Sequence, residues 1–361
     1  MLAVAGCAVA GTASAGTAGP AATANGTGFS VSGGLTAVAA TSAANAWAVG
    51  STAAHRALVV HWNGTGWSEQ ADPAGEALSA VAASSAGNAW AVGYTSGSSQ
   101  HTLTLHWNGR AWTRVASPGP AGGILNGVTT TSAGNAWAVG EYGDGNSIQP
   151  LILHWNGKKW TRVAVPRVTT APNQGSFLDS VSAASASSVW ASGSITSDFA
   201  GPQGGLMLHW NGRSWSKVSA SALAAASTIG AVAAPSVNSA WTMGCACAGG
   251  ADGAPISHWN GKTWTSVREP FGAAGGAGTT IAAAGGNAWA AGLYCKSRCI
   301  AGALGGAEFL MRWTGKAWQL TSHPAIQVTG LAVTSAGNAW AVGMSTAGKT
   351  VILHWNGKAW K

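Results

Sequence analysis

Charge is scarce in this chain of 361 residues, because Asp, Glu, Lys and Arg together make up only 8% of it. Soluble domains usually devote about a quarter of their residues to these four types. Apolar residues reach 47%, so we expect the fold to bury them in many small layers while Ser, Thr, Asn and Gly keep the surface soluble. The 53 glycines follow no G-X-Y period, which excludes a collagen helix.

Motifs of catalysis and cofactor binding are also missing. The chain has no G-x-S-x-G, no H-E-x-x-H, no Walker loop and no dinucleotide fingerprint. No stretch shows the 3.6-residue apolar periodicity of a helix, and no segment after residue 26 is a candidate for crossing a bilayer. We therefore expect no cofactor, no bound metal and no membrane span, and we favour a binding protein over an enzyme.

What the sequence does contain is a repeat with two tryptophan anchors, N-A-W-A-V-G and H-W-N-G-x-x-W, which alternate in seven copies. The first-anchor tryptophans are Trp47, Trp90, Trp137, Trp190, Trp241, Trp289 and Trp340. The second-anchor pairs are Trp62/Trp67, Trp107/Trp112, Trp155/Trp160, Trp210/Trp215, Trp259/Trp264, Trp313/Trp318 and Trp355/Trp360. Together they account for all 21 tryptophans, so none is left over for a special site.

Each repeat reads as four short strands. In the first repeat we predict strands over 35–41, 46–50 and 57–62, and a fourth strand that begins at Trp67. Four strands per roughly 50 residues, repeated along the chain, are typical of β-propeller blades. The fold class we predict is all-β, a seven-bladed β-propeller with four antiparallel strands per blade.

The propeller is predicted to span residues 27–361. Its blades start near Leu35, Leu78, Leu125, Leu178, Ile229, Ala277 and Val328. The chain ends at Lys361, soon after the fourth strand of the last blade begins. We therefore expect Phe29-Ser30-Val31 to help complete that blade and close the ring.

Turns and tryptophans are expected to build the structure rather than a site. Asn63-Gly64 predicts a two-residue type I′ turn, which places Trp62 opposite Thr65 and puts Trp62 and Trp67 on one face of the sheet. Because both faces of a blade pack against neighbouring blades, the tryptophans are interpreted as the core between blades. The glycine of the first anchor is expected to stop the second strand.

Length variation indicates where a ligand would bind. From the anchor glycine to the second-anchor Trp the count runs 12, 14, 15, 17, 15, 21 and 12 residues, whereas the two turns at the opposite end stay constant. Insertions gathered on one face of a repeat array usually mark its binding face. We predict contacts from the loops 141–149, 194–204, 245–254 and 293–308.

The candidate ligand-binding residues are the acids of these loops, Glu141, Asp144, Asp198, Asp252 and Glu308. None of the ten acids repeats at one blade position, so no catalytic residue is assigned. A glycoside hydrolase or lyase needs two carboxylates within about 5–10 Å of each other, and such a pair stays open as the alternative function.

The second-anchor histidines are interpreted as structural side chains that hydrogen-bond the neighbouring blade, rather than a metal ring or a set of bases. They are His61, His106, His154, His209, His258 and His354, with Arg312 in the sixth repeat. Basic residues recur two positions after the turn Asn or Thr, at Arg110, Lys158, Arg213, Lys262, Lys316 and Lys358. One charge per blade favours a solvated turn over nucleic-acid binding, and a polyanion or cell-wall role stays open.

Residues 1–26 are uncharged and rich in Ala and Gly, and they resemble a secretory leader with Ala-x-Ala cleavage sites. Val4-Ala5-Gly6-Cys7 also resembles a lipobox, so Cys7 is a candidate lipid anchor of an otherwise secreted protein. The remaining cysteines are Cys245, Cys247, Cys295 and Cys299. In an exported protein they predict disulfides, either within one loop or between two loops, in preference to a zinc site.

The two anchors together resemble secreted bacterial β-propellers grouped loosely with galactose-oxidase and kelch-like proteins, over residues 35–361. The resemblance implies a propeller fold and no inherited activity, because the copper-binding and sialidase arginine-triad patterns find no matching positions here. We expect a monomeric, secreted or cell-surface binding module that recognises a glycan or a protein through its variable loops.

Overall fold

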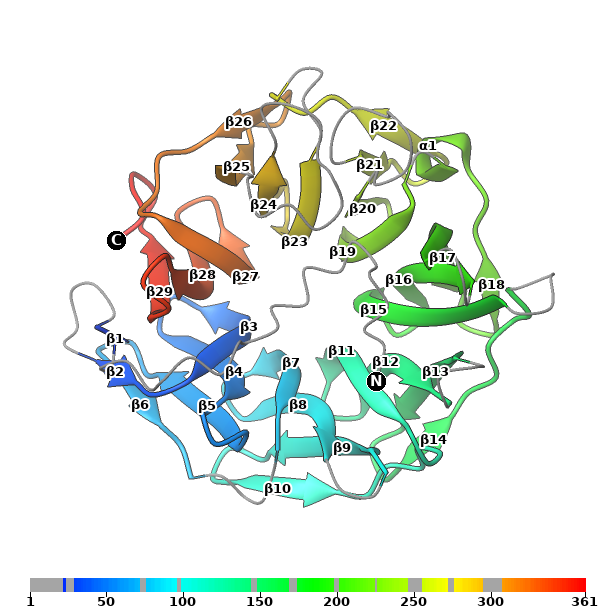
Figure 1. Cartoon of the computed structure of the whole chain (residues 1–361), viewed down its shortest axis with the longest axis horizontal. Coiled ribbons are helices and arrows are strands. Elements are labelled where there is room, and N and C mark those ends of the chain that lie inside the picture. The colour runs from blue at the N-terminus through cyan, green and yellow to red at the C-terminus, as the bar shows by residue number, and fades with distance from the viewer. Residues whose placement is uncertain are drawn as a thin grey trace. The chain divides into compact units, whose positions relative to one another are not determined.

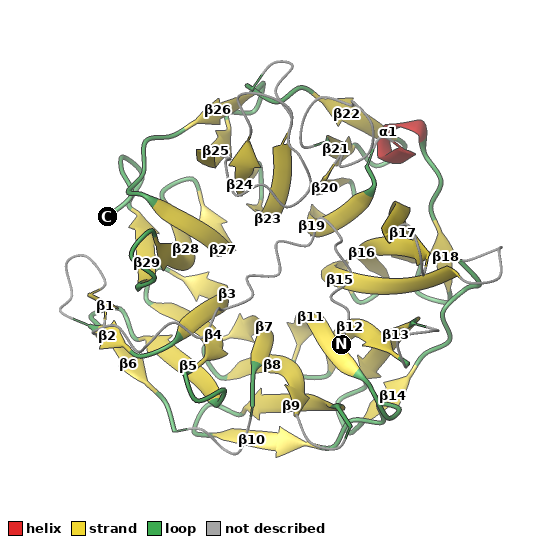
Figure 2. Ribbon diagram, in the orientation of Figure 1, coloured by secondary structure: helices red, strands yellow, loops and turns green. Residues whose placement is uncertain are grey.

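The structure is a computed structural model in which strands account for nearly all regular structure (Figure 1). It describes residues 22–23, 29–71, 76–95, 99–143, 148–168, 174–197, 201–224, 226–245, 255–271, 276–294 and 307–361. Within these ranges the only helix is α1 (Ser221–Ala224), which is far too short for a transmembrane segment (Figure 2). The all-β prediction is therefore confirmed.

The first two strands of each repeat form a hairpin around a short turn. The first strands are β3 (Gly34–Ser42), β7 (Leu78–Ser85), β11 (Ile124–Ser132), β15 (Gln174–Ser185), β19 (Thr228–Ser236), β23 (Gly276–Ala284) and β27 (Ile326–Ser335). The second strands are β4 (Asn45–Ser51), β8 (Asn88–Thr95), β12 (Asn135–Tyr142), β16 (Ser188–Ser197), β20 (Ser239–Cys245), β24 (Asn287–Tyr294) and β28 (Asn338–Ser345).

The last two strands form a second hairpin around the Asn-Gly turn. The third strands are β5 (Ala57–Trp62), β9 (His101–Trp107), β13 (Gln149–Trp155), β17 (Gly201–Trp210), β21 (Ile256–Trp259), β25 (Ala307–Trp313) and β29 (Thr350–Trp355). The fourth strands are β6 (Trp67–Glu69), β10 (Trp112–Val115), β14 (Trp160–Arg162), β18 (Trp215–Lys217), β22 (Trp264–Val267) and β26 (Trp318–Leu320).

Strands of one repeat pair in chain order and antiparallel throughout. The first four repeats make four separate four-stranded sheets. The fifth and sixth repeats share one eight-stranded sheet, because Cys245 of β20 also pairs with Ala277 of β23. The seventh repeat is a three-stranded sheet, in which a Trp355–Trp360 bridge takes the place of a fourth strand.

This meander gives every sheet two unlike ends. The turn end holds the turn between the first and second strands together with the Asn-Gly turn. The loop end holds the loop between the second and third strands together with the linker to the next repeat. We use these two names for each sheet separately.

The chain divides into two compact units. The three-repeat unit holds the fourth, fifth and sixth repeats (Ala164–Thr321) and the loop Gly143–Pro150. The four-repeat unit holds the first, second, third and seventh repeats (Thr12–Tyr142, Leu151–Val163 and Ser322–Lys361).

Tryptophans form the core between neighbouring repeats of a unit. Trp47 has no exposed surface, and its ring packs against Trp107 and Trp112 of the second repeat at centroid distances of 4.8 and 5.1 Å. Trp340 packs in the same way against Trp62 and Trp67 of the first repeat, at 5.3 and 5.2 Å. Each fully buried aromatic ring removes a large apolar area from water, so these contacts stabilise the stacking of the sheets.

The anchor glycine does not stop the second strand, contrary to the prediction. β4 continues through Gly50 to Ser51, and the first strand carries a β-bulge opposite it, between Leu35 and Ala37. A Cβ built on Gly50 would lie 1.9 Å from the carbonyl oxygen of Gly34, and the other six anchor glycines show the same clash at 1.9–2.2 Å. Glycine is therefore required by the close approach of the bulged strand.

The Asn-Gly turn is also wider than predicted. Trp62 pairs with Trp67, not with Thr65, so the loop contains four residues rather than two. Asn63 Oδ1 accepts hydrogen bonds from the backbone N–H of Thr65 and Gly66, both at 3.0 Å, and Gly64 adopts a φ of 97°. The side chain of Asn63 thus satisfies the turn amides, as in an Asx turn. Trp62 and Trp67 still share one face, as predicted.

The lead-in pairs differently from the prediction. β2 (Ser30–Val31) forms a two-stranded sheet with β1 (Ala22–Thr23), and does not extend the sheet of the seventh repeat. The fourth-strand position of that repeat is occupied by the chain's own end, where Lys361 and His354 exchange backbone hydrogen bonds of 2.8 and 3.0 Å. Val31 nevertheless lies in the core between the seventh and first repeats.

Candidate functional site

Two of the five predicted acids are described by the structure, and both lie at the loop end of their sheets. Glu141 is the seventh residue of β12, and Glu308 is the second residue of β25. Asp144, Asp198 and Asp252 lie outside the described residues. Glu141 belongs to the four-repeat unit and Glu308 to the three-repeat unit, and the carboxylate pair of the alternative function stays open.

Glu141 is a half-buried carboxyl at the loop end of the third repeat. Burial raises its pKa above the ordinary value, because the surrounding protein disfavours the charged form. The next residue, Tyr142, carries the guanidinium of Arg162 over its ring at 4.4 Å from the centroid, a cation–π contact. This edge therefore combines an acid, an aromatic ring and a cation.

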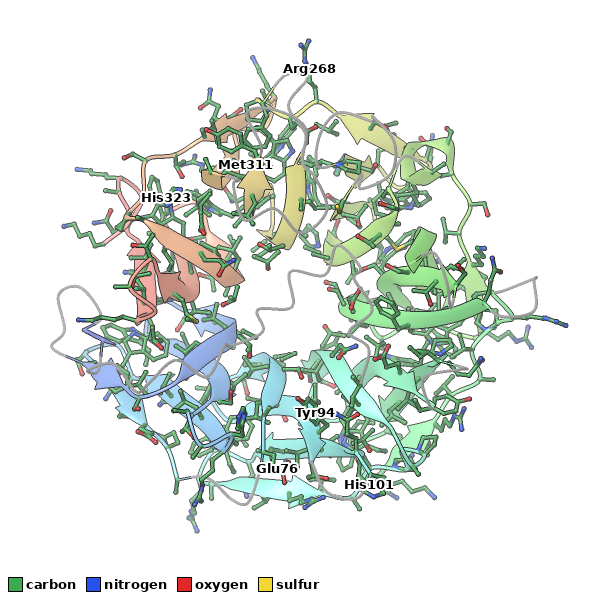
Figure 3. The ribbon with its side chains drawn as sticks, in the orientation of Figure 1. Glu76, Tyr94, His101, Arg268, Met311 and His323 are labelled. Atoms are coloured by element: carbon green, nitrogen blue, oxygen red, sulfur yellow. The ribbon has the colours of Figure 1, made fainter. Side chains whose placement is uncertain are left out.

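Tyrosine gathers at the loop end. All three tyrosines of the chain, Tyr94, Tyr142 and Tyr294, lie one or two residues after an anchor glycine, and all three are half-buried. Figure 3 marks Tyr94 on the four-repeat unit, with Glu76 and His101 from the same repeat. Because the tryptophans are confined to the anchors, the loop end draws its aromatic rings from Tyr and Phe.

The three-repeat unit carries an aromatic cluster at its loop end. Phe271, in the linker before the sixth repeat, stacks on Tyr294 with a centroid distance of 5.1 Å and an interplanar angle of 10°. Phe271 also contacts Phe309 at 4.6 Å. Phe309 is buried, whereas Phe271 and Tyr294 are half-buried and pack on the cluster from outside. Glu308 precedes Phe309 directly and pairs with Leu293, the neighbour of Tyr294.

An open pocket of about 330 Å³ lies at the loop end of the second repeat. It is lined by the exposed side chains of His101 and Arg114, by the hydroxyls of Thr102 and Ser117, and by Gly119. The two hydroxyls hydrogen-bond each other at 2.7 Å. A Cβ on Gly119 would lie 2.3 Å from Thr102 Oγ1, so the wall of the pocket needs glycine there.

No motif in the sequence predicts this pocket. Its residues come from the start of β9, the end of β10 and the following linker, and no other repeat has the same combination. Repeats identify the positions that stay constant, whereas this pocket is made of positions that vary. The one usable signal was the presence of variable connections at this end of the second repeat.

The second-anchor histidines each make a hydrogen bond within their own repeat. His61 Nε2 donates to Asn45 Oδ1 at 2.8 Å, and the ring stacks on Trp47 at a centroid distance of 4.0 Å. Asn45 belongs to the same repeat as His61. The prediction that the histidine hydrogen-bonds the neighbouring blade is therefore wrong. Within the described ranges, no group of three or more His, Cys, Asp or Glu side chains is placed to hold a metal ion.

The same bond recurs in the other repeats that carry the histidine. His106, His154 and His354 bond Asn at 2.7–2.9 Å, while His209 and His258 bond a Ser hydroxyl at 3.3 and 3.0 Å. Burial lowers the pKa of all six histidines, because each ring is partly removed from water. They act as structural links between the two turns of a repeat.

Of the cysteines, the described residues include only Cys245. It is buried at the loop end of β20, where it pairs with Thr228 and with Ala277, and it is not a free thiol. Cys7, Cys247, Cys295 and Cys299 lie outside the described residues, so the connectivity stays a prediction.

Comparison with known proteins identifies the fold. No protein-family profile and no curated protein sequence matches the chain. Among solved structures, the β-propeller domain of the Trilobed protease from Pyrococcus furiosus is similar with a TM-score of 0.58 and 7% identity, over 91% of this chain and 97% of that one. The protein YCF48 from Cyanidioschyzon merolae gives a TM-score of 0.55 and 16% identity, over 90% and 96% of the two chains.

A fucose-specific lectin from Aleuria aurantia is also similar, with a TM-score of 0.50 and 13% identity, over 79% of this chain and 94% of the lectin. The GH74 xyloglucanase from Xanthomonas campestris gives a TM-score of 0.61 and 15% identity, and 91% of this chain covers only 54% of that enzyme. The repeats therefore have a β-propeller fold. A fold shared by a lectin and a glycanase does not decide between binding and catalysis.

Proposed function

We propose that this protein is a non-catalytic binding module that recognises a glycan, or alternatively a protein, through the loop end of its sheets. The observation that carries the proposal is the segregation of aromatic residues. All 21 tryptophans lie in the two anchors, whereas Tyr94, Tyr142, Tyr294 and Phe271 lie half-buried at the loop end. Aromatic rings at a surface that varies between repeats are typical of recognition sites.

The chemistry of these residues suits carbohydrate. A half-buried tyrosine offers an apolar ring face to the C–H groups of a sugar and a hydroxyl to its polar edge. The pocket beside β9 adds the donors His101 and Arg114 in a volume of about 330 Å³, the lower part of the range for small-ligand sites. The similarity of the fold to a fucose-specific lectin is consistent with this proposal.

A second candidate function is hydrolysis or lysis of a glycan by loop carboxylates. The raised pKa of Glu141 favours it, because a general acid must hold its proton near neutral pH. The partner carboxylate would come from Asp144, Asp198, Asp252 or Glu308. We rank this function second because none of the ten acids recurs at one blade position in the sequence.

The proposal also includes the number of blades, the location of the protein and the pairing of its cysteines. We infer seven blades, one per repeat, from the seven pairs of tryptophan anchors. We also infer an exported, monomeric protein of kelch-like type, on the basis of the Ala-rich residues 1–26 and the clustered cysteines, with Cys7 as a candidate lipid anchor. Cys245 lies at the loop end of β20 and pairs with Ala277 of the sixth repeat, which favours a disulfide between the cysteine-bearing loops of the fifth and sixth repeats.

A glycan array on the full chain, followed by reducing-sugar release from any hit, tests the proposal. We expect binding without turnover, and we expect Y94A, Y142A or Y294A to weaken it about tenfold or more. Y94F, Y142F and Y294F are the matched controls that keep the ring. Turnover that E141Q abolishes would replace the binding module by the enzyme, and an empty array would leave a protein partner.

A further inference from the structure

We propose that the turn end of the sheets is a second interaction surface, which binds an acidic polysaccharide independently of the loop end. The proposal rests on the charges of the turn that joins the third and fourth strands. Seven basic residues lie in these turns: Arg110, Lys158, Lys159, Arg213, Lys262, Lys316 and Lys358. All seven side chains are exposed.

No negative charge offsets them. None of the ten Asp and Glu residues of the chain lies in either turn of any repeat. The six acids that the structure describes are Glu69, Glu76, Glu141, Asp179, Glu269 and Glu308, and all of them lie on strands or linkers toward the loop end. Within both the four-repeat unit and the three-repeat unit, the turn end therefore carries charge of one sign.

The turn itself does not need a cation. Its third residue donates a backbone N–H to the Asn side chain, at 3.0 Å for Arg110, 3.0 Å for Lys158 and 3.1 Å for Lys358. In the first repeat Thr65 occupies this position and makes the same bond at 3.0 Å. The contact uses only the backbone, so any residue that tolerates the turn would satisfy it.

A need for solubility does not explain why the charges of these turns are positive. A turn exposed to water is solvated equally well by Asp or Glu, and acids improve solubility more than bases do. A chain with only 18 basic and 10 acidic residues has placed seven of the former and none of the latter here. Like charges repeated at one end create a positive potential that attracts a partner with repeated negative charges.

The apolar and aromatic side chains near the turn end argue against a lipid surface or a single-stranded nucleic acid as the partner. Insertion into a lipid surface needs exposed apolar side chains, and among the described residues only Val237 and Leu320 are large, apolar and exposed. Binding of single-stranded nucleic acid needs free aromatic faces for stacking. The second-anchor indoles near these turns are packed against other indoles: the ring centroids of Trp62 and Trp340 lie 5.3 Å apart, and those of Trp107 and Trp47 lie 4.8 Å apart.

A flexible polysaccharide with repeated sulfate, carboxylate or phosphate groups fits these properties. Long, mobile Lys and Arg side chains on separate turns contact separate charges of the polymer. Each contact is weak, and the sum depends on how many turns are engaged at once. Displacement of counterions makes such binding strongly dependent on salt.

Dextran sulfate and neutral dextran form a matched pair of probes, because they differ only in charge. We expect the full-length protein to bind dextran sulfate with an affinity that falls steeply with salt, and to ignore dextran. The variant R110T/K158T/K358T gives three turns the residue of the first repeat. We expect it to bind about tenfold or more weakly at low salt, with the slope of log K against log salt reduced by about three.

The control variant R167T/R268T/K349T removes three exposed cations that lie outside the turns, so its net charge is the same. We expect it to weaken binding less than twofold, and we expect T65K to strengthen binding. Equal losses in the two triple variants would overturn the proposal, since net charge alone would then explain the attraction. So would an unchanged affinity of T65K, or failure of the wild-type protein to bind dextran sulfate.

Discussion

Trp90 and Tyr94 lie four residues apart on β8, the first toward the turn end and the second at the loop end. Trp90 has no exposed surface and contacts His106, Trp155 and Trp160 at centroid distances of 4.4–4.9 Å. Tyr94 is half-buried and has no counterpart in most repeats. The same strand thus runs from the turn end, where packing against neighbouring rings restricts the residue type, to the loop end, where the residue type differs between repeats.

The difference between the two ends explains why the repeat is so regular at one end only. At the turn end, each repeat that carries the histidine bonds it to its own first turn, and within a unit the tryptophans pack against the next repeat. A change there therefore disturbs two sheets. At the loop end a side chain meets solvent and its own loop. Whether a residue is constant or variable between repeats therefore depends on its position along the strand, from the turn end to the loop end, rather than on its distance from the core.

Replacing the two residues of β8 should show the largest contrast. We expect W90A to lower the free energy of unfolding by about 3–5 kcal/mol, because it removes a fully buried ring between two sheets. Y94A should cost about 1 kcal/mol or less, because the ring is only half-buried. Urea unfolding of both variants measures the difference. Equal losses would show that the loop end is as tightly packed as the turn end.

Glycine substitutions should give the next largest effect. G93A adds a Cβ that would lie 2.2 Å from the carbonyl oxygen of Ala77, so β8 must move away from the bulge of β7. We expect a loss of about 1–3 kcal/mol in the free energy of unfolding. G66A is the matched control, since a Cβ there meets nothing within 4 Å. A neutral G93A would mean that the bulge does not require glycine.

Lowering the pH should change the free energy of unfolding in opposite directions at the two ends. We expect this effect to be smaller than those of the two substitutions above. The turn-end histidines have lowered pKa values, so the unfolded chain binds protons more readily than the folded one. Their stabilisation is complete above the unfolded pKa of about 6.5 and is lost as the pH falls below it toward the lower folded pKa. The raised pKa of Glu141 works the other way, and its stabilisation is lost as the pH rises.

The thermal midpoint of unfolding, followed from pH 8 to pH 5, measures this balance. We expect it to fall with acidification, because six histidines oppose one glutamate. H106Q/H154Q should flatten the curve, because it removes two of the histidines whose pKa burial lowers. E141Q should steepen the fall. A wild-type curve that rises toward pH 5 would contradict the assignment.

Sequence alone predicted the strands and the role of the tryptophans, because both depend on short-range patterns that recur. It failed where two geometries share one pattern. Asn63-Gly64 fits a two-residue turn and a four-residue turn equally well, and only the pairing of Trp62 with Trp67 decides between them. Gly50 reads as a strand end until the bulge opposite it is seen.

The candidate site was less predictable for a physical reason. Charged loop residues such as Glu141 and Glu308 are conspicuous in a chain with few charges, so a prediction from sequence favours them. The pocket of His101 and Arg114 depends on how a strand end and a linker meet, and its aromatic counterpart depends on Phe271 reaching Tyr294 from the preceding linker. Neither of these two contacts produces a repeated pattern in the sequence.

The links inside the turn end also bear on how the chain acquires its structure. His61 bonds Asn45 across 16 positions, and Trp62 bonds Ala43 across 19, so both contacts close within a single repeat. Short loops close quickly and at a low entropy cost, whereas contacts between distant segments form late. We expect each repeat to form its turn end early, as a local nucleus, and the indole stacking between repeats to follow as successive nuclei meet.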